Sequence, residues 1–153
     1  MRLLYISLVR SKLEYASSIW HPHISFLTDS IESVQNRAAR FIQSDYSRFS
    51  SVSLMKSNLS LPLLATRRKV FRLCLLHKVD YSPLLHQTLL TPPTSSSSRL
   101  DHSNKIARPR CFSTAHQNAL LPDAIADWNG LPGDIVAIDR GPHQISRSDS
   151  TTL

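Results

Sequence analysis

Glycine is the residue that this sequence most clearly lacks. Only three occur in 153 residues, Gly130, Gly133 and Gly141, and the first 129 residues contain none. Phosphate-binding loops and nucleophile elbows need glycine where the backbone turns sharply or approaches a ligand closely. The sequence therefore excludes a dinucleotide-binding fold, a P-loop NTPase and an α/β-hydrolase. It also argues against a β-sandwich or barrel, whose hairpins favour glycine turns.

Cysteines, acidic residues and long apolar runs are scarce as well. Cys74 and Cys111 are the only cysteines, so we expect reduced thiols in a cytoplasmic or nuclear, non-secreted protein. No two of the eleven acidic residues are adjacent, whereas a polymerase or nuclease needs clustered carboxylates to hold its metal ions. No apolar run approaches the roughly 20 residues that span a bilayer. We expect no metal, no cofactor, no small-molecule substrate and no membrane partner, and we predict that the chain alone is catalytically inactive.

Positive charge is concentrated in the first half of the chain. Eighteen Lys and Arg against eleven Asp and Glu give a formal net charge of +7. Residues 1–80 contain twelve of the basic and five of the acidic residues, and the remainder contains six of each. Such a distribution favours an anionic partner, nucleic acid before membrane, because phosphate contacts release counterions. A generically basic, solvated surface gives the same composition, so charge alone leaves both interpretations open.

Hydrophobic periodicity predicts a mostly α-helical chain. The expected helices cover residues 2–20, about 25–43, about 52–58, 63–79, a short piece from Ser82, and 123–129. On the second helix, we expect one apolar stripe to face the core: Leu27, Ile31, Val34, Ala38, Phe41 and Ile42. The second half of 63–79 is apolar nearly all round, so we expect Cys74 to be a small core residue. The predicted organisation is a helical bundle (1–90), a flexible basic Ser/Pro-rich linker (91–118), a C-terminal helix (119–138) and a disordered tail (139–153).

Six basic residues on two of these helices are the candidate nucleic-acid contacts. Two of them lie three positions apart on a polar helix face, and four occupy the first half of 63–79, which we expect to be partly exposed. Guanidinium groups at such spacings can contact successive phosphates of one nucleic-acid strand. The candidate set is Arg37, Arg40, Arg67, Arg68, Lys69 and Arg72. We expect few exposed aromatic side chains nearby, and therefore weak binding with little base preference.

The sequence His21-Pro22-His23 is the nearest approach to a metal motif. An extended His-x-His projects its rings to different sides, and zinc would need a distant cysteine as well. We interpret it as a polar turn between helices. The sequence contains no complete active site.

Four blocks of this sequence resemble the region downstream of the polymerase core in non-LTR (LINE-type) retrotransposon reverse transcriptases. The first is LVRSKLEYA at 8–16, followed by IWHP at 19–22. The second is VQNRAARFI at 34–42, and the third is LSLPL at 59–63 with Arg67-Arg68. The fourth comprises Leu121-Pro122, Ile125, the WNGLP ending at 128–132 and Ile135-Val136. The order and spacing of the blocks follow the family over about residues 3–138.

This resemblance implies a fragment of an RNA-directed DNA polymerase. In the family, the palm with its metal-binding aspartates lies upstream of these blocks, so no catalytic residue is carried over. The resemblance implies a thumb-like helical bundle that grips RNA or DNA by its phosphate backbone, with the absent palm as a further candidate partner. Asp123 departs from the family, which usually has a basic residue there. The alternatives are a helical protein-interaction module, a decayed open reading frame without activity, or a basic helix on a membrane surface.

Overall fold

Every regular element that the structure describes is a helix, which confirms the predicted fold class. The structure is a computed structural model and describes residues 1–93 and 104–137. The predicted tail at 139–153 lies outside these residues. None of the described helices is both long enough and apolar enough to cross a membrane. The elements are α1 (Arg2–Leu4), the π-helical η1 (Tyr5–Arg10), α2 (Ser11–Glu14), α3 (Ser17–Trp20), α4 (Ser25–Gln43), α5 (Val52–Asn58), α6 (Leu64–Tyr81), α7 (Pro83–Leu89), α8 (Thr114–Gln117), α9 (Leu120–Asn129) and α10 (Gly133–Ala137).

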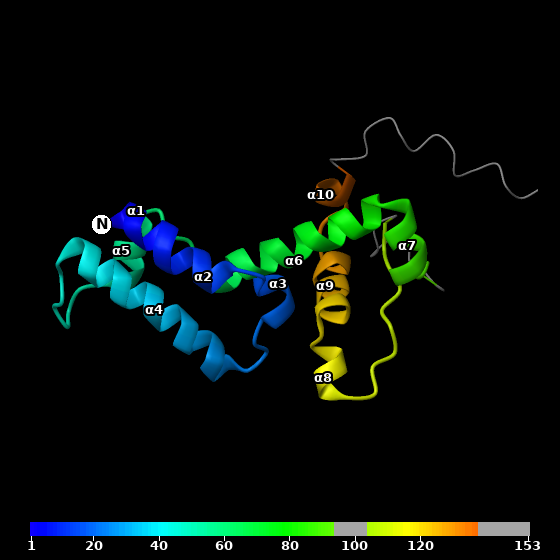
Figure 1. Ribbon diagram of the computed structural model, residues 1–153, viewed down its shortest axis with the longest axis horizontal. Coiled ribbons are helices and arrows are strands. Elements are labelled where there is room, and N and C mark those ends of the chain that lie inside the picture. Colours follow the sequence, from blue (N-terminus) through cyan, green and yellow to red (C-terminus); the bar gives the residue numbers. More distant parts are fainter. Residues whose placement is uncertain (94–103, 138–153) are drawn as a thin grey trace, which may run out of the picture.

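The long helix α6 is the axis on which the other elements are arranged (Figure 1). The first elements, α1 to α5, lie around one end of α6, and α4 packs against both α5 and α6. Helix α9 crosses the other half of α6, and α7 folds back on its end. The molecule is therefore elongated, with one packing region on each half of α6.

The packing region on the second half of α6 is apolar. Ile125 and Trp128 of α9 are 2% and 5% exposed and pack with residues of α6 and α10, with Leu90 just after α7, and with Ile106. The buried cluster comprises Leu76, Val79, Leu90, Ile106, Ala124, Ile125, Trp128 and Val136. Trp128 therefore docks α9 on the second half of α6.

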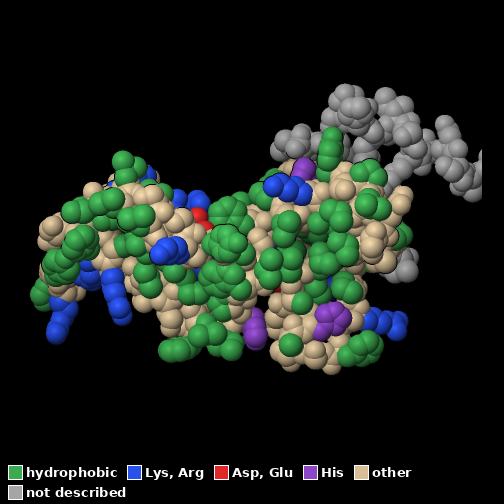
Figure 2. Space-filling view, viewed as in Figure 1, with side chains coloured by type: hydrophobic (Ala, Val, Ile, Leu, Met, Phe, Trp, Pro, Cys, Tyr) green, Lys and Arg blue, Asp and Glu red, His purple; other side chains and the backbone are tan. Residues whose placement is uncertain are grey.

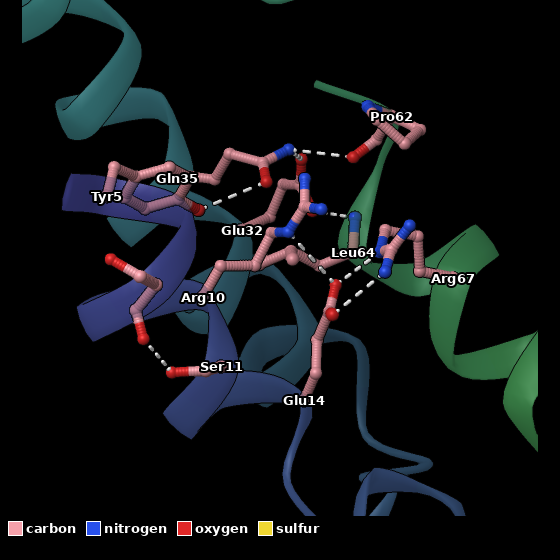
Figure 3. Close-up of polar contacts among 10 residues, drawn as sticks. Tyr5, Arg10, Ser11, Glu14, Glu32, Gln35, Pro62, Leu64 and Arg67 are labelled. Carbon is pink, nitrogen blue, oxygen red and sulfur yellow. Dashed lines mark hydrogen bonds and ion pairs between the residues drawn. The ribbon is translucent and has the colours of Figure 1, made fainter. Parts of the chain in front are cut away.

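The packing region on the first half of α6 is held by polar contacts (Figure 3). The Tyr5 hydroxyl donates to Gln35 Oε1 at 3.1 Å, and Gln35 Nε2 donates to the Pro62 carbonyl at 2.9 Å. Burial of the ring raises the pKa of Tyr5 to about 12. Glu32 accepts from Lys56 Nζ at 2.9 Å and from the Leu64 amide at 3.0 Å. These contacts compensate groups whose burial would otherwise be costly, and they fix α4 against α6.

The single helix predicted over residues 2–20 is wrong. The chain leaves helical geometry after Glu14, where Ala16 adopts a left-handed backbone with φ of 50°, and α3 begins at Ser17. Left-handed geometry is unfavourable for alanine and is tolerated only where tertiary packing requires it. Here the turn lets α3 pack on α6 and buries Ser17. No glycine or proline marks this break in the sequence.

Helix α4 has the predicted bounds but buries a different face. Its buried residues are Gln35 and Ala39, while Leu27 and Phe41 of the predicted stripe are exposed. At 3.6 residues per turn this is a rotation of roughly 80° from the predicted stripe. The cause is the pairing of Gln35 with Tyr5 and Pro62, together with the small Ala39, which lets neighbouring helices approach. As a consequence, Phe41 and Arg37 share the solvent-exposed side of the helix.

Cys74 is exposed, so its prediction as a core residue is wrong. The buried stripe of α6 is Leu64, Arg68, Arg72, Leu76 and Val79. These residues follow a spacing of four or three, and Cys74 lies on the opposite side of the helix.

The predicted flexible linker over 91–118 is corrected where the structure describes it. Ile106 is buried in the apolar cluster, and its backbone amide and carbonyl both hydrogen-bond the Asn129 side chain, at 3.0 and 2.8 Å. Trp128 Nε1 donates to the Asn104 carbonyl at 3.0 Å. The Ser/Pro-rich residues 94–103 lie outside the described part of the chain. The segment that begins at Asn104 is thus fixed on α9.

Candidate nucleic-acid interface

The six basic residues predicted to bind phosphate do not form one surface. Four of them lie on α6 and two on α4, and the α6 residues are engaged within the fold. Arg67 forms a bidentate pair with Glu14 of α2, in which Nη2 and Oε2 are 2.9 Å apart, and its guanidinium lies 5.3 Å from the Phe71 ring centre. The hydrogen bonds to Glu14 raise the pKa of Arg67 above its ordinary value. Arg67 therefore joins α6 to α2 (Figure 3).

Lys69 and Arg72 pair with the acidic residues of α9. Arg72 Nη2 lies 2.8 Å from Asp127 and 3.2 Å from Asp123, and Lys69 Nζ lies 2.8 Å from Asp127. The Arg72 side chain is only 7% exposed. Burial disfavours the charged form of Asp127, but hydrogen bonds from Lys69 and Arg72 outweigh it and hold its pKa below the ordinary value. The two aspartates, which sequence analysis did not assign to any contact, therefore join α9 to α6.

Arg68 is fully buried, with 0% of its surface exposed. None of its three guanidinium nitrogens has a hydrogen-bond partner among the described residues. Burial lowers the pKa of Arg68, an effect that the nearby Glu32 charge opposes and the Arg72 charge reinforces. A buried charge without hydrogen bonds is costly. Arg68 and Arg72 are thus corrected from exposed phosphate contacts to interior residues.

Arg68→Met is expected to raise the free energy of unfolding by about 1–3 kcal/mol. Methionine keeps the length of the buried stem and removes the charge that has no hydrogen-bond partner in the described fold. Urea unfolding followed by circular dichroism measures the change. Arg37→Met, at an exposed position of α4, is the matched control and should change stability by no more than about 0.5 kcal/mol. A loss of stability in Arg68→Met would show that the charge is compensated.

A groove of about 480 Å³ lies between the α3–α4 turn, α6 and α9. Its charged side chains are Lys69, Arg72, Asp123 and Asp127, which neutralise one another. His21 also lines it, and burial, followed by the charges of Arg72 and Arg68, lowers the pKa of this imidazole. No group of three potential metal ligands gathers anywhere in residues 1–93 and 104–137. The groove therefore offers no net charge to a phosphate.

The two α4 residues of the candidate set lie at the end of the molecule where α4 leads into α5. Arg37 is exposed, and Arg40 is half-buried with Nη1 2.9 Å from the Ser47 carbonyl to which it donates. This hydrogen bond ties the connecting loop, residues 44–51, back to α4. Arg48 is exposed on that loop, although sequence analysis left it out of the candidate set.

Three exposed aromatic side chains lie in the same segment of the chain as these arginines, contrary to our expectation. The exposed fractions are 58% for Phe41, 66% for Tyr46 and 98% for Phe49. Figure 2 shows hydrophobic and basic side chains side by side at this end of the molecule, on the left of the view. We call this surface the loop patch and define it by Arg37, Arg40, Phe41, Tyr46, Arg48 and Phe49.

The loop patch has an ordered backbone and a positive charge. Ser44 ends α4 in a left-handed conformation, and the Asp45 amide donates to the Arg40 carbonyl at 3.1 Å. Asp45 is the one acidic residue within 37–49, against three arginines. Hydrogen bonds from the Ser50 side chain and the Ser47 amide hold the pKa of Asp45 below its ordinary value. The patch thus presents cations and aromatic rings on a defined loop.

Comparisons with protein-family models, with curated proteins and with solved structures find no match to this chain.

Proposed function

We propose that this chain is a non-catalytic part of a retroelement RNA-directed DNA polymerase, from the helical region downstream of the palm, and that it binds nucleic acid through the loop patch. The observation that carries the binding proposal is the gathering of three arginines, two of them exposed and Arg40 half-buried, beside one acidic residue in 37–49. Phosphate backbones reward such a surface regardless of base sequence. The four candidate residues of α6 are buried or paired within the fold and are left out of the interface.

The proposal treats the sequence blocks as parts of one folded unit, and the polar contacts between the blocks support that point. Glu14 of the first block pairs with Arg67 of the third, and Gln35 of the second donates to Pro62 of the third. In the fourth block, Trp128 and Asn129 fix the segment at Asn104–Ile106. The residues that carry the resemblance thus hold the fold together, as expected if the blocks descend from one folded unit.

Replacing the three arginines of the loop patch by glutamine is expected to flatten the salt dependence of nucleic-acid binding. With about 0.7–0.9 counterions released per phosphate contact, the log–log slope should fall by roughly 2 units in Arg37→Gln/Arg40→Gln/Arg48→Gln. Filter binding of a short RNA across a salt series measures this slope, and circular dichroism checks the fold.

The matched control removes the same charge elsewhere on the surface. Arg2, Lys12 and Lys78 are exposed, and their replacement by glutamine should leave the slope unchanged. Equal flattening in both triple variants would indicate diffuse attraction to a basic surface and contradict a defined interface. Absence of salt-dependent binding by the wild-type chain would contradict the binding proposal altogether.

A helical protein-interaction module is the second candidate function. The observation in its favour is the exposure of large apolar side chains on α1 and η1, where Leu3, Leu4 and Leu8 all face solvent. Contiguous apolar surface of this kind is typical of a protein interface. Such a module would bind its partner without a steep salt slope, so the same salt series separates the two functions.

A further inference from the structure

We infer that the loop patch is a site for single-stranded nucleic acid, in which unpaired bases stack on Tyr46 and Phe49 while the arginines contact the phosphates. This inference rests on the proposed function and specifies the substrate class of the same surface. Three of the chain's five phenylalanines and four tyrosines fall within residues 41–49. All three are mostly exposed. Other exposed aromatic side chains of the described residues, such as Tyr15, Phe26 and Phe112, are dispersed along the sequence, whereas these three lie in the same short segment as three arginines.

Hydrogen bonds fix the backbone of the loop in a conformation that leaves Tyr46 and Phe49 exposed to solvent. The Ser47 amide donates to Asp45 Oδ1 at 3.0 Å, and the Phe49 amide donates to Ser47 Oγ at 3.3 Å. The Arg40 guanidinium donates to the Ser47 carbonyl from the α4 side. The loop thus has a hydrogen-bonded shape in which Phe49 is almost fully exposed. Leaving a phenyl ring in water forgoes the gain of burying it, which favours a partner that covers the ring.

The chemistry of the surface selects unpaired bases. A stacking base must expose its face, which base pairing hides within a duplex. Aromatic side chains stack on every base, so such a site tolerates sequence but distinguishes single strands from duplexes. Arginines beside the rings supply the phosphate contacts, and the spacing of Tyr46, Arg48 and Phe49 alternates ring and cation along the loop. An acidic protein would pair with the arginines, but it has no bases to stack on the exposed aromatic rings.

The decisive variant is Tyr46→Leu/Phe49→Leu, which keeps two apolar side chains and removes both aromatic faces. We expect its affinity for a short single strand to fall by about 10- to 100-fold, because each stacked base contributes several-fold or more. Its affinity for a duplex of the same sequence should change by less than about twofold, and its salt slope should be unchanged, since no phosphate contact is lost.

Two controls isolate stacking from a general effect of aromatic loss. Tyr81 and Phe112 are equally exposed, at 68% and 94%, so Tyr81→Leu/Phe112→Leu should bind single strands like the wild-type chain. A strand of abasic sugar-phosphate keeps the charges and lacks bases. The wild-type chain should bind it about as weakly as Tyr46→Leu/Phe49→Leu binds the intact strand.

The outcomes distinguish this inference from the proposed function. Salt-dependent binding that is equal for single strands and duplexes, or that is unaffected in Tyr46→Leu/Phe49→Leu, would overturn single-strand stacking and leave the proposed function standing. Absence of any salt-dependent nucleic-acid binding by the wild-type chain would overturn both the inference and the proposed function. Tighter binding to anionic lipid vesicles or to an acidic protein than to the single strand, abolished in the same variant, would assign the patch to that partner and overturn the inference.

Discussion

Asp127→Asn is expected to lower the free energy of unfolding by about 3 kcal/mol. Asp127 accepts from Arg72 at 2.8 Å, and the two side chains are 19% and 7% exposed. Removing one partner of a buried ion pair leaves the other charge poorly compensated, which costs several kcal/mol. Asp123 retains one contact with Arg72 but is 35% exposed, so it offsets only part of the loss. The pair with Lys69, whose side chain is 51% exposed, contributes little.

The same substitution should change the acid sensitivity of the fold. The pKa of Asp127 is held below its ordinary value of 3.8 in the folded chain. Its stabilising contribution is therefore present above the unfolded pKa, near 4, and is lost as the pH falls through the lower folded pKa. Wild-type stability should decrease through this acidic range, and Asp127→Asn should lack that part of the decrease.

Urea unfolding at neutral and acidic pH measures both effects. Asp29→Asn is the matched control, because Asp29 is an exposed acid on α4 and should contribute less than about 0.5 kcal/mol. If Asp127→Asn is as stable as this control, then Arg72 is compensated by other groups and α9 does not depend on the ion pair.

The existence of the helices could be predicted from local sequence, because their determinants lie within a few residues. The bounds of α4 and α5 agree with the predicted ranges, and α6 begins just after Pro62, whose missing amide is tolerated near a helix start. At the other end of the chain, α9 ends at Asn129, the predicted last residue, and Gly130 is its C-cap, although the helix begins three residues before the predicted start. These signals arise from periodicity, proline and glycine, which act locally.

The packing of α6 could not be predicted in the same way, because its partners are far away in sequence. Arg67 meets Glu14, 53 positions earlier, and Arg72 meets Asp127, 55 positions later. From local sequence alone, a run of basic residues at the start of a helix predicts an exposed cationic face. Here Arg68 and Arg72 are buried, because distant segments of the chain cover them. The i, i+4 series of Leu64, Arg68, Arg72 and Leu76 is the one local signal, since it continues the apolar stripe through the arginines.

The loop patch was only partly predictable, for a related reason. Arg37 and Arg40 were assigned from their helical spacing, but the rotation of α4 that exposes Phe41 depends on the contacts of Gln35 with Tyr5 and Pro62. Tyr46 and Phe49 lie in a serine-rich segment without periodicity, so nothing local predicts whether they are buried. Their proximity to Arg40 follows from its hydrogen bond to Ser47, which only the tertiary structure reveals.

Trp128→Ala is expected to lower the free energy of unfolding by about 3–5 kcal/mol. The indole is 5% exposed, packs in the apolar cluster of α6 and α9, and donates to the Asn104 carbonyl. Truncation removes its apolar burial, creates a cavity and takes one donor from the carbonyl of half-buried Asn104. Trp128→Phe keeps most of the burial and should cost less, about 1–2 kcal/mol.

Trp128 also reports directly on whether α9 is docked, because α9 is too short to be stable alone in water. The chain has one other tryptophan, Trp20, so a Trp20→Phe variant isolates the Trp128 signal. Its emission should be blue-shifted and resist acrylamide quenching in the native chain, and both properties should disappear in a single unfolding transition with the helical circular dichroism signal. In the same background, Asp127→Asn should shift that transition to lower urea without changing the native spectrum, since it weakens the ion pair and leaves the indole site intact. Native emission as red-shifted and as readily quenched as in urea would mean that α9 is not docked on α6, and the Asp127–Arg72 pair would then be absent as well.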